Sequence, residues 1–153
     1  MTRPTDPITD GLQRVLAAQH LAVYGYPVIG VHLSDPAEAD RARQLEASHR
    51  LRRDATAGQL VGRQADPVAN APDYPPPAPV TDRSTAIGWA VRIEETSAAG
   101  YRYLLECAVR AGGDQTAIRQ QAMTGLTEAA QAAAYWRGLT NPGRPTVPFP
   151  GAP

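Results

Sequence analysis

The stretch TDGLQRVLAAQHLAVYGYPVIGVHLS, residues 9–34, decides the fold. Its apolar side chains recur every three or four positions, which is the spacing of one face of an amphipathic helix. The positions on that face are Leu12, Val15, Leu16, Gln19, Val23, Tyr26, Pro27 and Gly30. Asp6 is suited to cap this helix and Pro7 to its first position, while Pro27 should kink it or end its regular part. We therefore expect a first helix over residues 7–33.

Three further segments carry the same periodicity, and each has its own start or stop signal. Asp35 begins a capping box, two glycines follow the third segment, and Asp114 is placed to cap the fourth. Because the first connection is so short, the first two helices must be antiparallel neighbours. The expected helices cover residues 36–63, 82–111 and 114–138.

Two proline-rich segments interrupt or follow this pattern. Residues 64–81 cannot form a helix or a central strand, because proline removes backbone donors and restricts its neighbours. A connection of this length is what a parallel neighbour requires, since an antiparallel hairpin needs only a few residues. Residues 139–153 form an extended tail. The sequence thus predicts one all-α domain over residues 1–153, a four-helix bundle with a long crossover between the second and third helices.

Composition and charge exclude several classes of function. The chain has 153 residues, of which 42% are hydrophobic and 20% are charged, and its net charge is zero. Such a chain has no overall field that would attract nucleic acid or an anionic membrane. All 15 basic residues are arginine, which together with abundant alanine and proline indicates a GC-rich bacterial genome. The sequence has no apolar signal-peptide core and no membrane-spanning stretch, so we expect a cytoplasmic protein.

A few polar residues fall on the apolar faces when each helix is projected at about 100° per residue. Glu46 and His49 form a Glu-x-x-His pair on the second helix, and residues three apart share a helix face. Glu94 on the third helix can supply a second carboxylate. Carboxylates with an imidazole suit iron, manganese or zinc. The candidate metal site is therefore Glu46, His49 and Glu94, with Gln19 and His20 as nearby polar residues.

The sequence leaves three interpretations of these residues open. A dimetal centre needs about four carboxylates and two histidines, but Gln19 stands where a first-helix glutamate is wanted and the fourth helix lacks a Glu-x-x-His pair. A single bound metal is the second interpretation. In the third, Arg53 neutralises Glu46 and Glu94 in a buried ion network, and His49 and Gln19 satisfy one another.

Several stretches of the chain are similar to a known family. They are Leu16-Ala-Ala-Gln-His-Leu-Ala-Val-Tyr-Gly-Tyr26, His49-Arg-Leu-Arg-Arg-Asp54, Pro79-Val-Thr-Asp82, Glu94 with Tyr101, and the closing Thr146-Val-Pro-Phe-Pro-Gly151. Together they resemble a family of ferritin-like bacterial domains of unknown function, the DUF4439 type, over nearly the whole chain. The resemblance implies a ferritin-like bundle with no established activity. It also implies that the family usually has glutamate where this chain has Gln19.

The function expected from the sequence is that of a ferritin-like protein with a degenerate or absent metal site, not an enzyme and without a cofactor. Such a protein would act through its surface, by forming a homodimer or by binding a protein partner. The alanine-rich fourth helix and the tail are the expected dimer surfaces. The alternative is an oxidase or storage protein that binds iron or manganese through Glu46, His49 and Glu94. A small apolar ligand between the helices is a third hypothesis.

Overall fold

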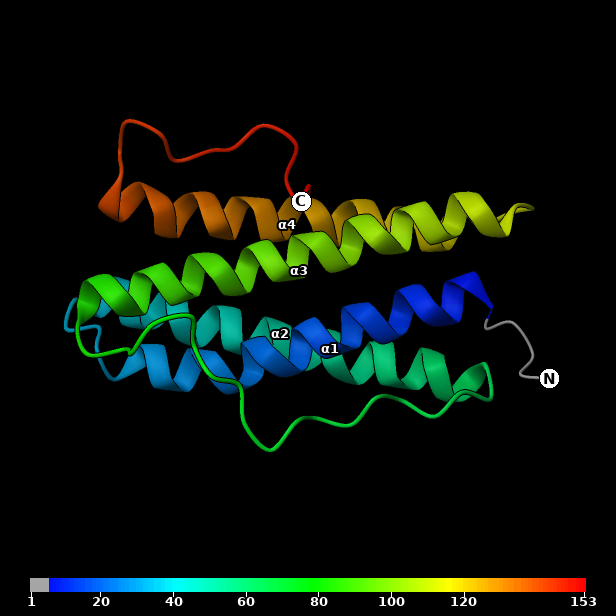
Figure 1. Ribbon diagram of the computed structural model, residues 1–153, viewed down its shortest axis with the longest axis horizontal. Coiled ribbons are helices and arrows are strands. Elements are labelled where there is room, and N and C mark those ends of the chain that lie inside the picture. The colour runs from blue at the N-terminus through cyan, green and yellow to red at the C-terminus, as the bar shows by residue number, and fades with distance from the viewer. Residues whose placement is uncertain (1–5) are drawn as a thin grey trace.

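The computed structural model describes residues 6–153, and this part of the chain contains four helices and no strand. The helices are α1 (Pro7–Gly30), α2 (Pro36–Gly62), α3 (Arg83–Ala111) and α4 (Thr116–Thr140). They lie side by side in one bundle, with the crossover along one flank and the tail folded back along another (Figure 1). The prediction of an all-α four-helix bundle is confirmed.

Local signals in the sequence set three of the four helix starts. An aspartate accepts hydrogen bonds from the first backbone amides of α1, α2 and α3, and in α3 Thr85 completes a capping box. Such caps satisfy amide groups that have no partner within the helix. The three caps are Asp6, Asp35 and Asp82.

Three boundaries differ by two residues or more from the sequence prediction, and one of them is the end of α4, which lies at Thr140 instead of residue 138. Helix α1 includes Pro27 and ends at Gly30 instead of continuing to residue 33. Gln115 occupies the N-cap position of α4, whereas Asp114 was expected there. Asp114 still accepts a hydrogen bond from the Thr116 amide at 3.0 Å, so it supports the first turn from one position further out.

The crossover allows α2 and α3 to run in the same direction, while α1 with α2 and α3 with α4 run antiparallel (Figure 1). The main packing interfaces are α3 with α4, α1 with α3, and α1 with α2. The parallel pair α2 and α3 is therefore not a closely packed pair, which differs from the expectation that they would be neighbours. None of the four helices combines the length and the apolar character that crossing a membrane requires.

Polar side chains bridge α2 and α4 on the remaining side of the bundle. The amides of Gln59 and Gln121 donate to each other at 2.8 and 2.9 Å, and Arg52 pairs with Glu128. The Tyr101 ring lies behind these bridges at the floor of a pocket between α2 and α4, where Gly125 leaves room for it on α4.

The crossover is tied to α1 by three polar side chains along one side of that helix. Gln13 bonds to the Asp66 carbonyl at 2.7 Å and to the Val68 amide at 2.8 Å. His20 Nε2 lies 3.0 Å from the Val68 carbonyl, and Tyr24 donates to Asp73 at 3.0 Å. His20 therefore holds the crossover in place and is partly exposed, away from the centre of the bundle.

The core consists of two apolar clusters at opposite ends of the bundle. One surrounds Trp89 and Trp136, and the other surrounds Leu12, Leu16 and Leu104. Along each of the first three helices, a buried polar residue lies between the part that enters one cluster and the part that enters the other. The bundle therefore has a polar layer at its middle.

Candidate functional site: a buried polar layer

Residues from three helices form the middle of the polar layer. The side chains of Gln19 on α1, His49 on α2, and Glu94 and Ser97 on α3 are all fully buried. Buried polar groups of this kind are stable only when they bond to one another, because they have lost their hydrogen bonds to water.

A continuous chain of hydrogen bonds links these groups and recruits Tyr26 and Trp136. Trp136 Nε1 donates to the Tyr26 hydroxyl at 3.0 Å, and that hydroxyl donates to Glu94 Oε1. His49 Nε2 lies 3.0 Å from the same carboxylate oxygen. His49 Nδ1 lies 2.6 Å from Gln19 Oε1, and Gln19 Nε2 donates to Ser97 Oγ at 3.3 Å. All four helices thus contribute to one network.

The network defines how the Gln19 amide and the His49 imidazole are oriented. Because Gln19 uses its amide hydrogen on Ser97, its oxygen faces His49 Nδ1 and accepts from it. The other ring nitrogen faces the Glu94 carboxylate. Both ring nitrogens of His49 therefore face oxygen atoms, one of an amide and one of a carboxylate, and these two contacts fix the orientation of the imidazole.

The second carboxylate oxygen of Glu94 lies outside this network. Glu94 Oε2 is buried and has no hydrogen-bond partner, and it is the only such side-chain atom among the described residues. An unpaired buried acceptor costs free energy, so the carboxylate is stabilised through Oε1 alone. Oε2 remains the point at which the layer can accept one more hydrogen bond.

Tyr26 keeps its proton in this environment. Burial, the Glu94 charge and the hydrogen bond to Glu94 raise the pKa of Tyr26 well above its ordinary value of 10.0. Its ring also stacks on the His49 imidazole, with centroids 5.7 Å apart and planes at 22°. The hydroxyl therefore serves as a permanent donor to the carboxylate.

The raised pKa of Tyr26 leads to a prediction for alkaline stability. Above pH 10 the unfolded chain loses this proton while the folded chain keeps it, so the free energy of unfolding falls as pH rises. We expect the urea midpoint to fall between about pH 9.5 and 11, and to fall less steeply in Tyr26→Phe. The other tyrosines account for the slope that remains. Equal slopes in the two proteins would contradict the prediction.

The structure brings together only part of the expected metal site. His49 and Glu94 are in contact, and Gln19 joins them. Glu46 instead pairs with Arg50 one turn along α2, with Arg50 Nε 3.0 Å from its carboxylate. The interpretation in which Arg53 neutralises both glutamates is wrong on this point, because Arg53 pairs with Asp54, its neighbour in the chain, at 2.9 Å.

Two aromatic residues complete the layer in a way that sequence reasoning did not foresee. Tyr26 and Trp136 both fall on the apolar faces of their helices, where they are expected as core residues. A buried indole N–H or phenol O–H needs a partner, and this general requirement is the signal that points to a polar role. Helical projection does not show that these two groups meet each other and Glu94.

The donor set in the layer does not fit a dimetal centre. Such a centre needs about four carboxylates and two histidines, and the layer has one of each. Within residues 6–153, no three His, Cys, Asp or Glu side chains gather in a way that would hold a metal ion. On α4 the buried positions beside the layer are Ala129, Ala132, Ala133 and Trp136. The layer therefore lacks the ligands that a dimetal centre needs.

Two solved structures have the same fold. One is a conserved hypothetical protein, rv2844, from Mycobacterium tuberculosis, with 28% identity and a TM-score of 0.78, covering 90% of this chain and 99% of its own. The other is described as ferritin-like, diiron-carboxylate proteins from Bacillus anthracis str. Ames. It has 13% identity and a TM-score of 0.78, with 92% of this chain and 100% of its own covered, and it supports the fold alone.

The comparison with curated proteins finds no match. The family model "Domain of unknown function (DUF4439)" matches residues 11–153, which include all four residues at the middle of the polar layer, the crossover and the tail. The match extends over nearly the whole chain, in agreement with the resemblance carried by its sequence motifs. The chain therefore belongs to this family of domains of unknown function and has a ferritin-like fold.

Proposed function

We propose that this chain is a ferritin-like binding domain in which the central layer stabilises the bundle and the surface carries the function. The observation that supports the proposal is the hydrogen-bonded chain from Trp136 to Ser97. It uses both nitrogens of His49 and one oxygen of Glu94 within the protein. A layer that satisfies its own groups in this way fits a structural role better than a redox role.

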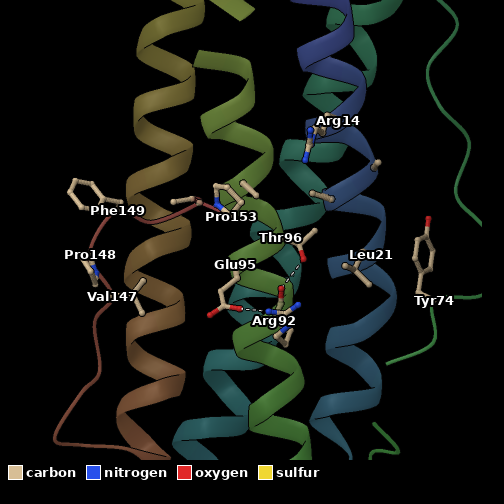
Figure 2. Close-up of a pocket in the computed structure, with 15 residues that line it drawn as sticks. Arg14, Leu21, Tyr74, Arg92, Glu95, Thr96, Val147, Pro148, Phe149 and Pro153 are labelled. Carbon is tan, nitrogen blue, oxygen red and sulfur yellow. Dashed lines mark hydrogen bonds and ion pairs between the residues drawn. The ribbon is translucent and has the colours of Figure 1, made fainter. Parts of the chain in front are cut away.

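The surface that best suits binding is a groove over α1 and α3. It has a volume of about 820 Å³, and its floor includes small and apolar side chains of both helices. The charged side chains of Arg14, Arg92 and Glu95 also line it. The tail forms one wall and Tyr74 of the crossover lies at the other side (Figure 2). A groove of this kind, between two extended segments, is a typical place for an apolar ligand or a protein partner.

The competing hypothesis is a protein that binds one iron or manganese ion with a reduced ligand set. The observation in its favour is Glu94 Oε2, which has no partner and belongs to a residue that contacts both His49 and Tyr26. Glu46, the third expected ligand, is paired with Arg50, so this hypothesis requires the α2 side chain to rearrange.

Elemental analysis distinguishes the two hypotheses. The protein is purified without chelator or affinity nickel, incubated with ferrous or manganous ion, desalted and analysed beside a His49→Gln variant. We expect both proteins to carry far below one metal per chain, because the ring nitrogens are already bonded within the layer. One metal per chain that disappears in the variant would overturn the proposal in favour of the metal-binding hypothesis.

A further inference from the structure

The tail is held against the bundle at two points. Arg137 donates to the Pro145 carbonyl at 2.7 Å. Gly151 lies so close to α3 that a Cβ there would be 2.7 Å from the Ala98 carbonyl oxygen, and its φ is +78°. Only glycine fits both the contact and the backbone conformation. The tail is therefore a docked segment with a defined path.

The docked tail ends in a turn that carries Phe149 at its first position. The Ala152 amide donates to the Phe149 carbonyl at 3.1 Å, and Pro150 and Gly151 occupy the central positions, as in a type II turn. Phe149 itself has a φ of 52°, which is unfavourable for a residue with a side chain.

The aromatic ring of Phe149 is nevertheless in solvent, with 82% of its surface exposed. It points away from Leu21 and Tyr74, whereas the tail residue Val147 lies nearer the bundle (Figure 2). A large apolar group held in an unfavourable conformation and turned outward gains nothing within the single chain. Covering the ring with another molecule would bury this apolar surface.

The same face of the chain holds a groove of about 820 Å³, which is large enough to admit a phenyl ring and has both apolar and charged side chains in its lining. Its apolar floor is formed by Ala17, Ala18, Leu21 and Ala99, and it lies beside the tail segment that carries Phe149. The ring does not reach this floor in its own chain, because Gly151 fixes the turn on Ala98. Phe149 thus belongs to the rim of the groove in its own chain, but its ring remains exposed and does not cover the apolar floor.

We propose that two copies pair about a two-fold axis, with Phe149 of each copy inserted into the groove of the other. This inference rests on the proposed function, since it names the partner of that groove as a second copy. A two-fold pair requires each copy to present both complementary elements, as this face does. The zero net charge of the chain means that no overall repulsion opposes the pairing.

Sedimentation equilibrium of the full chain between about 1 and 300 µM tests the proposal. We expect a reversible dimer, and a dissociation constant raised about 100-fold or more in Phe149→Ser, because each dimer loses two central anchors. Leu51→Ser is the matched control, since Leu51 is 73% exposed on α2 and should leave the dissociation constant unchanged. A wild-type monomer throughout, or a Phe149→Ser protein that dimerises normally, would overturn the proposal.

A mixing experiment tests whether the insertion is reciprocal. Ala17→Arg blocks the groove and should also produce a monomer. When it is mixed with Phe149→Ser, one intact ring can enter one intact groove, so a mixed dimer should form more strongly than either variant pairs with itself. Absence of the mixed dimer would contradict reciprocal insertion. Metal content, measured on the same samples, reports separately on the proposed function.

Discussion

Replacing Glu94 with alanine is expected to lower the free energy of unfolding by about 3–5 kcal/mol, because it removes the acceptor that two buried polar groups share. The change leaves the His49 imidazole and the Tyr26 hydroxyl without their common acceptor in the interior. Urea unfolding followed by far-ultraviolet circular dichroism at pH 7 measures the effect.

Glu46→Ala is the matched control for this experiment. Glu46 also carries a carboxylate that pairs with a cation, but its partner Arg50 is more than half exposed. Surface pairs at this helical spacing contribute about 0.3–0.5 kcal/mol, so the control should change stability little. If both variants lost similar stability, the polar layer would not be the main electrostatic contribution to the fold.

Gly125→Ala is expected to destabilise the bundle by about 1–3 kcal/mol, because a methyl group there overpacks the core. The added Cβ would overlap several ring atoms of Tyr101. Tyr101 is only 3% exposed, so the added methyl group forces a buried ring out of its packed position. Thermal unfolding followed by circular dichroism measures the effect.

A glycine-to-alanine substitution in α3, at Gly88, should change the stability in the opposite direction. Gly88 is exposed within the helix, and a Cβ there meets nothing within 4 Å. Gly88→Ala should therefore stabilise the protein by about 0.5–1 kcal/mol through helix propensity alone. A neutral or stabilising Gly125→Ala would show that the Tyr101 ring relaxes more easily than its packing indicates.

The helices follow from the sequence because their signals are local. Each of Asp6, Asp35 and Asp82 bonds to amides within three residues of itself, so the start of the helix is encoded in a short segment. The face of each helix that is buried in the core also follows from a local pattern, the periodicity of its apolar residues. Gln19, His49 and Glu94 are accordingly expected inside, and they are buried there.

The contacts among those residues cannot be predicted from periodicity, because they depend on how the helices are positioned relative to one another. A helical projection gives the face of each residue but not its level along the bundle relative to the other helices. Tyr26 and Trp136 are 110 positions apart in sequence, and their hydrogen bond depends on that relative level. Glu46 and Arg53 lie near the margins of the α2 face, where nearby partners of opposite charge determine where the side chains turn.

The path of the tail likewise cannot be predicted from the sequence. Its prolines exclude a helix but do not specify which surface it contacts, because extended segments have no apolar periodicity to match. Gly151 contacts Ala98 through close steric fit, and Arg137 donates a hydrogen bond to the backbone carbonyl of Pro145. The sequence predicts an extended tail, and only the folded bundle defines its path.

The position of the polar layer between two apolar clusters also restricts how the helices can slide past one another. Moving one helix along its axis by one turn, about 5.4 Å, would place an apolar side chain opposite Glu94 or His49 and leave a buried charge without its partner. The apolar clusters alone tolerate such a shift more readily, because apolar contacts are not directional. The layer therefore specifies a single register for the four helices, as a single buried polar residue does in a coiled coil.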